Sequence, residues 1–210
     1  MGARMFTAVI PPIEVVEELD AFCQPRREAG PLRWTPAASW HLTTAFMADV
    51  GDRHVDRLTE GLAAAAARTE PFGMRLGGAG TFGPPDAGRH LWLGLVEGAD
   101  ALGALSVRCR NAAEHAGVPT DGARFTPHLT LARTNRTTDL RRLLRVLDTF
   151  DADGWTADEL LLIESHLADR GNRYEVVGRF GLGATGTTSL WGDAPTRHAA
   201  SAPADTTEAP

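Results

Sequence analysis

Two short stretches of this sequence share the pattern His-Leu-Thr-x-Ala. The first lies at residues 41–46 (His-Leu-Thr-Thr-Ala-Phe) and the second at residues 128–133 (His-Leu-Thr-Leu-Ala-Arg). An imidazole titrates near neutral pH, so one histidine can accept a proton while a second one donates a proton. A threonine hydroxyl can donate a hydrogen bond to an anion. Two such stretches facing one another would surround one small anion with two imidazoles and two hydroxyls, which suits acid–base chemistry on a phosphate ester.

The residue types of both stretches favour β-strands. Alternate side chains of a strand point to the same face, so His41 and Thr43 would lie side by side, as would His128 and Thr130. The leucine between each pair would point into a core. A single His-x-Thr is common by chance, but core packing does not explain why the polar pair recurs on one face in both stretches. We therefore interpret the four polar residues as a functional site.

The elements around the two stretches also repeat. Each half of the chain is predicted to run strand, helix, His-x-Thr strand, helix, strand, and the histidines lie 87 residues apart. The expected strands cover residues 4–10, 40–46, 72–76, 89–96, 126–133, 159–165 and 173–180, and the expected helices cover 13–22, 51–68, 99–116 and about 138–147. Residues 77–85, rich in glycine and proline, are predicted to be a turn-rich crossing, and 168–172 to join a hairpin.

This repetition predicts an internally duplicated, bilobal α+β fold. We expect two antiparallel sheets, with helices on their outer faces and a cleft on a pseudo-two-fold axis between the lobes. One domain would span residues 1–183, with lobes of roughly 1–83 and 84–183 that could exchange strands. Residues 184–210 are rich in Ala, Thr, Ser and Pro and are predicted to be a disordered tail.

Composition excludes several classes of function. The net charge of −6 argues against a broad contact with duplex nucleic acid, and all 21 basic residues are arginine. The lack of lysine excludes a P-loop and any covalent lysine intermediate. Cys23 and Cys109 form no zinc pattern, neither motif histidine has metal-ligand spacing, and no cofactor is implied. Without an apolar span or a leader sequence, we expect a cytoplasmic monomer with no membrane contact.

Beyond these motifs, the chain resembles the two-histidine (2H) phosphoesterase superfamily over residues 4 to about 182. Within it, the sequence is most similar to the bacterial RNA 2′,3′-cyclic phosphodiesterases, also called 2′-5′ RNA ligase-like proteins. Matching stretches include residues 4–9, 80–82, 91–94, 125–133 and 162–165.

The resemblance implies hydrolysis of RNA 2′,3′-cyclic phosphate ends to 2′-phosphates without a metal ion. It implies that His41 is the proton donor, that His128 is the proton acceptor, and that Thr43 and Thr130 bind the phosphate. The spacing alone does not say which histidine is the acid.

The resemblance also places Phe46 beside the base and Arg133 beside the phosphate. Strict alternation puts both on the opposite face from the histidines, so they reach the cleft only if each strand ends, twists or bulges first. In this sequence Thr44 follows the first motif threonine, where the family usually has an aliphatic residue. Thr44 is expected to point away from the cleft.

Two alternatives remain open. One is 2′-5′ RNA ligase activity at the same site, with a 5′-hydroxyl in place of water. The other is a non-catalytic module that binds nucleotides or RNA ends. Among further residues, His166 could approach the cleft, and Arg136, Arg141, Arg142 and Arg145 could contact a longer RNA strand.

Overall fold

The computed structural model describes residues 2–27, 32–122, 124–166, 173–183 and 188–189. The helices are α1 (Ile13–Cys23), α2 (Asp52–Ala67), α3 (Ala99–His115) and α4 (Arg141–Leu147), with two short 3-10 helices, η1 (Gln24–Arg26) and η2 (Ala37–Ser39). The strands are β1 (Ala3–Val9), β2 (Arg33–Trp34), β3 (Leu42–Val50), β4 (Phe72–Gly80), β5 (Gly88–Glu97), β6 (Leu129–Thr138), β7 (Trp155–Ala157), β8 (Glu159–His166), β9 (Arg173–Gly181) and β10 (Thr188–Ser189). In this described part, no helix is long and apolar enough to cross a membrane.

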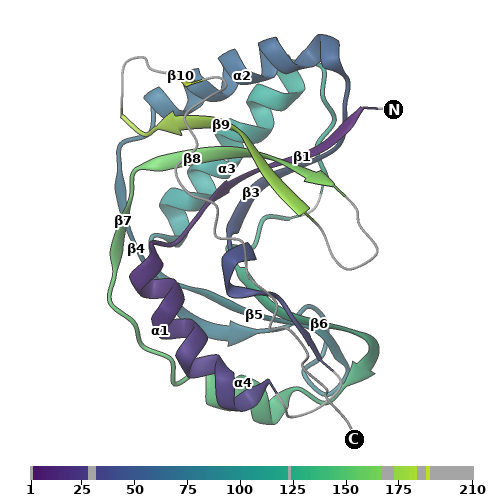
Figure 1. The fold of residues 1–210 in the computed structure, drawn as a ribbon, viewed down its shortest axis with the longest axis vertical. Helices are drawn as coiled ribbons and strands as arrows, with labels where there is room; N and C mark the ends of the chain where they lie inside the picture. The colour runs from purple at the N-terminus through teal and green to yellow at the C-terminus, as the bar shows by residue number, and fades with distance from the viewer. Residues whose placement is uncertain (1, 28–31, 123, 167–172, 184–187, 190–210) are drawn as a thin grey trace, which may run out of the picture.

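All ten strands belong to one curled antiparallel sheet, so the expectation of two separate sheets is wrong. The order is β10-β9-β8-β1-β3-β6-β5-β4-β7, and β2 pairs with β6. The halves become one sheet because the two His-x-Thr strands, β3 and β6, pair with each other where Leu42 lies opposite Leu129. Figure 1 shows the two halves curving away from this junction, with α2 and α3 covering one and α1 and α4 beside the other.

The halves also exchange strands at their edges. Strand β4 comes from the first half of the chain but pairs with β5 and β7. Strands β8 and β9 come from the second half, and β8 pairs with β1. The duplicated order of elements therefore folds into two parts of the sheet that each contain strands from both halves of the sequence.

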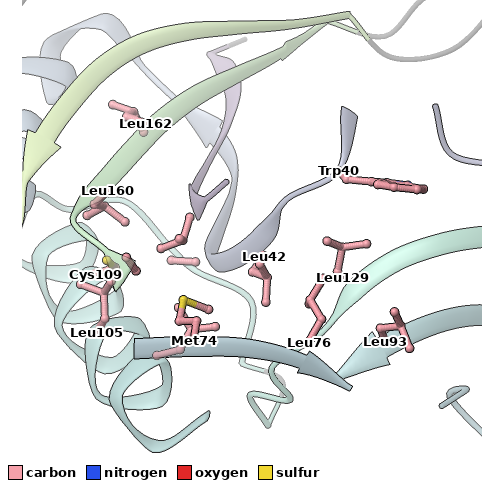
Figure 2. Packing of buried hydrophobic residues seen from close by; sticks show 14 of the residues in the cluster. Trp40, Leu42, Met74, Leu76, Leu93, Leu105, Cys109, Leu129, Leu160 and Leu162 are labelled. Carbon is pink, nitrogen blue, oxygen red and sulfur yellow. The ribbon is translucent and has the colours of Figure 1, made fainter. Parts of the chain in front are cut away.

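One continuous apolar core joins the halves beneath the helices. It includes Leu42 and Leu129, both fully buried, together with residues from α2, α3 and β5. Figure 2 shows these two leucines among Leu76, Leu93 and Trp40. A smaller cluster (Phe6, Ala8, Leu161 and Ile163) lies on β1 and β8 and contacts Phe46 and Tyr174.

Several element boundaries differ from the expectation. Strand β4 continues to Gly80, into the first four residues of the segment 77–85 predicted to be a turn-rich crossing, and the rest of that segment is irregular as expected. Gly80 is needed for close packing, because a Cβ there would lie 2.0 Å from the Trp92 ring. Strand β6 runs to Thr138, so α4 begins only at Arg141. In the segment expected to be a tail, Thr188 and Ser189 pair with β9, while the rest of 184–210 and the 168–172 connection lie outside the described residues.

Candidate active site

The junction of β3 and β6 brings the two motifs together. In an antiparallel ladder centred on Leu42 and Leu129, residue 41 lies across from 130 and residue 43 across from 128. Because both leucines point into the core, the four polar side chains share the opposite face. The structure thus places His41, Thr43, His128 and Thr130 on one face, all partly buried.

Each histidine is held by the same local hydrogen bond. The His41 Nδ1 atom lies 2.8 Å from the Ser39 carbonyl oxygen, and the His128 Nδ1 atom lies 2.7 Å from the Thr126 carbonyl oxygen. A carbonyl only accepts, so Nδ1–H is the donor in both rings. In the neutral imidazole, Nε2 is then the atom with a free lone pair, available to exchange a proton with a bound molecule.

A β-bulge in β3 changes which residues face the site. Thr7 of β1 lies opposite Ala45, and the next residue, Ala8, lies opposite Thr43, so Thr44 is an extra residue in β3. Thr44 and Ala45 are both buried on the core side. The Thr44 hydroxyl bonds the Thr7 hydroxyl at 2.7 Å, which agrees with the expectation that Thr44 points away from the cleft.

A second bulge occupies the matching position of β6. Leu91 of β5 lies opposite Ala132, and Trp92 lies opposite Thr130, so Leu131 is the extra residue. Leu131 and Ala132 are again both buried. Each bulge falls three residues after a histidine, so the two motifs share an irregularity of backbone as well as a pattern of residues.

The bulges return Phe46 and Arg133 to the face of the histidines. Phe46 lines a cavity together with Thr43 and His128, and the Arg4 guanidinium lies 5.3 Å from its ring centre. Arg133 is close enough for its charge to lower the pKa of both His41 and His128. The condition under which these two residues could reach the cleft is therefore met by a bulge in each strand.

Aromatic rings that sequence reasoning left out of the site surround each histidine. The His41 ring lies 4.7 Å from Phe6 and 5.5 Å from Tyr174, between ring centres. The His128 ring lies 5.0 Å from Phe82 and 6.0 Å from Trp92. Both 80–82 and 91–94 already stood out as stretches matching the family, and that was the available signal. The contacts themselves depend on the folding of β4, β5 and β9.

Burial makes both histidines weak bases in the free protein. It lowers the pKa of His41 to about 4, and the charges of Arg133 and His128 lower this pKa further against the opposing hydrogen bond to Ser39. Burial, and then the charge of Arg133, also lower the pKa of His128. Both rings are therefore neutral at pH 7 before an anion binds.

The low pKa of His41 predicts a loss of stability in acid. His41 takes up a proton near pH 6.5 in the unfolded chain and only near pH 4 in the folded chain. Its contribution to the stability of the folded state is therefore complete above pH 6.5 and is lost as the pH falls toward 4. This residue alone should lower the free energy of unfolding by about 2 kcal/mol between pH 8 and pH 5. Urea denaturation at several pH values measures the change, and His41→Gln should flatten the slope. If the free energy of unfolding of that variant depends on pH as it does in the wild type, the low pKa does not belong to His41.

Two further histidines of the described residues, His166 and His90, lie on strands of the same sheet. His166 is at the end of β8, 3.6 Å from Glu164 and 3.4 Å from Glu175. Strand alternation puts His166 with Glu164 on the face opposite Ile163, and Ile163 packs in one cluster with Phe6, whose ring contacts His41. His166 therefore does not approach the site. His90 of β5 lies opposite Arg133, and its ring centre is 5.8 Å from that of Phe82, so His90 borders the site.

A single sheet that pairs two His-x-Thr strands is the architecture of a two-histidine phosphoesterase. The profile of the 2′-5′ RNA ligase superfamily matches residues 11–169, and the chain belongs to this superfamily. Among its relatives is the RNA 2′,3′-cyclic phosphodiesterase of Aquifex aeolicus, 30% identical over 155 residues, which are 72% of this chain and 82% of that protein. The enzyme of the same name from Geobacillus stearothermophilus is 36% identical over 132 residues, 62% of this chain but only 42% of that protein.

Solved structures share the fold. Apo E. coli LigT superposes with a TM-score of 0.71 at 24% identity, covering 86% of this chain and 97% of LigT. A protein of Thermus thermophilus, TT0787, superposes with a TM-score of 0.71 at 23% identity, covering 87% of this chain and all of that one (100%). The curled sheet is therefore common to these proteins.

Proposed function

We propose that the protein is an RNA 2′,3′-cyclic phosphodiesterase that hydrolyses cyclic ends to 2′-phosphates. The observation that supports this most directly is the paired arrangement at the β3–β6 junction. Two imidazoles, each with Nδ1–H bonded to a backbone carbonyl, share one face with two threonine hydroxyls. The names of the Aquifex and Geobacillus relatives agree with this activity. LigT has been solved with 3′-AMP, which agrees with a nucleotide ligand.

In the proposed reaction the histidines act on opposite sides of the phosphorus. His128 Nε2 takes a proton from water as the water oxygen forms a bond to phosphorus. The bond between phosphorus and the ribose O3′ breaks, and His41 gives its proton to O3′. The phosphate stays on O2′, and each histidine ends in the protonation state in which the other began, so proton exchange with solvent resets the site.

The remaining residues bind charge and base. The Thr43 and Thr130 hydroxyls donate to the non-bridging phosphoryl oxygens, and the Arg133 guanidinium attracts the same anion. Phe46 packs against the base. Because the free pKa of His41 is about 4, the bound phosphate must raise that pKa so that His41 is protonated before it acts as the acid.

The test is to follow a defined oligonucleotide with a 2′,3′-cyclic end in excess EDTA. We expect full activity, because no step uses a metal ion, and a product that carries its phosphate on O2′. Phosphatase treatment and chromatography against 2′- and 3′-phosphate standards identify the product. A 3′-phosphate would contradict the direction of bond breaking, and loss of activity in EDTA would contradict the metal-independent mechanism.

A second candidate is 2′-5′ RNA ligase activity, which the name of the superfamily favours. The same site would then use a 5′-hydroxyl strand in place of water. Excess 5′-hydroxyl strand should give joined product if this reaction occurs. If neither hydrolysis nor joining is seen while the cyclic end still binds, the protein is a non-catalytic binding module.

A further inference from the structure

The site opens into a cavity on one side. The cavity has a volume of about 270 Å³ and begins at Thr43 and His128. Three phenylalanine rings line its apolar part, namely Phe46, Phe82 and Phe125. A nucleobase offers two flat π-faces that stack on such rings. A cavity of this size and lining, next to the phosphate-binding hydroxyls, suits one nucleoside.

Part of the cavity lining is attached to β3 through Asp121. The Asp121 N–H donates to the Phe46 carbonyl at 3.3 Å. Arg110 of α3 donates to the Asp121 carbonyl at 3.1 Å and to its carboxylate at 3.2 Å. Arg110 and Asp121 therefore hold this part of the lining in place and offset each other's charge.

Arg124 differs from Arg110 although both line the cavity. Its side chain is exposed, and among the described residues it takes part in no hydrogen bond or ion pair. The carboxylate three residues earlier, Asp121, is already bonded to Arg110. Arg124 thus presents a free guanidinium at the rim of the cavity, and a guanidinium binds phosphate oxygens with paired N–H donors.

We propose that Arg124 binds the phosphodiester immediately 5′ of the terminal nucleoside, so that the site prefers RNA ends of two or more nucleotides to a lone cyclic nucleotide. The inference rests on the proposed function. A terminal nucleoside in the cavity carries the cyclic phosphate toward the histidines and its 5′ linkage toward solvent. That linkage is the next anionic group along an RNA chain, and a 2′,3′-cyclic mononucleoside lacks it. With a net charge of −6, the protein depends on local cations of this kind to hold RNA.

The test compares two substrates with the variant Arg124→Gln. One substrate is adenosine 2′,3′-cyclic phosphate, and the other is the dinucleotide ApA ending in the same cyclic phosphate. The variant should lower kcat/KM for the dinucleotide by about tenfold or more, since a charge-assisted hydrogen bond is lost. It should leave the mononucleoside within about twofold, because the group that Arg124 binds is absent there. For the dinucleotide, the slope of log kcat/KM against log salt concentration should also become shallower by about one, because one phosphate contact is lost.

Arg142→Gln is the matched control. Arg142 is an exposed arginine on α4 that does not line the cavity. If this control, and not Arg124→Gln, selectively impairs the dinucleotide, the longer strand lies along α4 and the proposal is wrong. Equal loss on both substrates in Arg124→Gln would also overturn it. If the wild-type protein hydrolyses neither substrate, the proposed function itself fails. If the wild-type protein hydrolyses both substrates without preference for the dinucleotide, the proposed function stands and the role of Arg124 is wrong.

Discussion

Replacing either motif histidine by alanine should reduce kcat/KM on a cyclic-ended RNA by about 10²- to 10⁴-fold. Each variant removes one proton transfer, and the phenyl rings that contact the two histidines, Phe6 beside His41 and Phe82 beside His128, offer no acid or base in its place. Initial rates measured by separation of the reaction products give the comparison. Full activity in both variants would show that the chemistry lies elsewhere.

The two variants should differ on a substrate that needs no acid. A nitrophenyl phosphodiester releases a stable anion without protonation, so His41→Ala should lose far less activity on it than on RNA. His128→Ala should lose activity on both, because water still needs a base. The reverse pattern would exchange the two roles. His115→Ala is the control, because His115 is exposed at the end of α3 and bonds the Asn111 carbonyl.

Leu129→Ala should lower both stability and activity. Leu129 is fully buried and lies opposite Leu42 at the junction of the halves. Truncating a buried leucine costs about 2–5 kcal/mol, which corresponds to a fall in Tm on the order of 10 °C for a chain of this size. Because the same pairing sets the spacing of the two histidines, kcat/KM should fall by about tenfold or more even where the variant is folded.

Leu19→Ala is the control for this prediction. Leu19 is equally buried but lies on α1, outside the junction. Its truncation should cost similar stability, measured by urea unfolding, and leave activity near wild type at a temperature where the protein stays folded. If Leu129→Ala matches Leu19→Ala in activity, the junction does not position the site. Leu42→Ala with Leu129→Ala should be non-additive, because the two residues face each other.

The sequence predicted the parts of the site that depend on local alternation. His41 and Thr43 share a face because they are two residues apart, and the same holds for His128 and Thr130. Phe46 and Arg133 could not be placed, because a bulge is a property of two paired strands and not of one. Thr44 is an extra residue only relative to β1, and Leu131 only relative to β5.

The sequence predicted the individual helices and strands better than the way in which the strands join into one sheet. Hydrophobic periodicity locates helices such as α1 and α3, because each helix buries one face along its length. Whether two half-sheets join depends on a single long-range pair, Leu42 with Leu129, which has no local signature. Glycines at 77–80 were misread as a turn because Gly80 makes room for Trp92, a contact that only tertiary structure reveals.

The matching bulges have a consequence for the direction in which an RNA end binds. A site made of two identical halves would accept a phosphate in two orientations, related by a half turn, with equal free energy. Here the same bulge delivers a phenyl ring, Phe46, on one side and a guanidinium, Arg133, on the other. Because these two residues differ, the two orientations no longer have equal free energy, and we expect the RNA strand to bind with one polarity. Two histidines with nearly identical hydrogen bonds can then take unequal parts in one reaction.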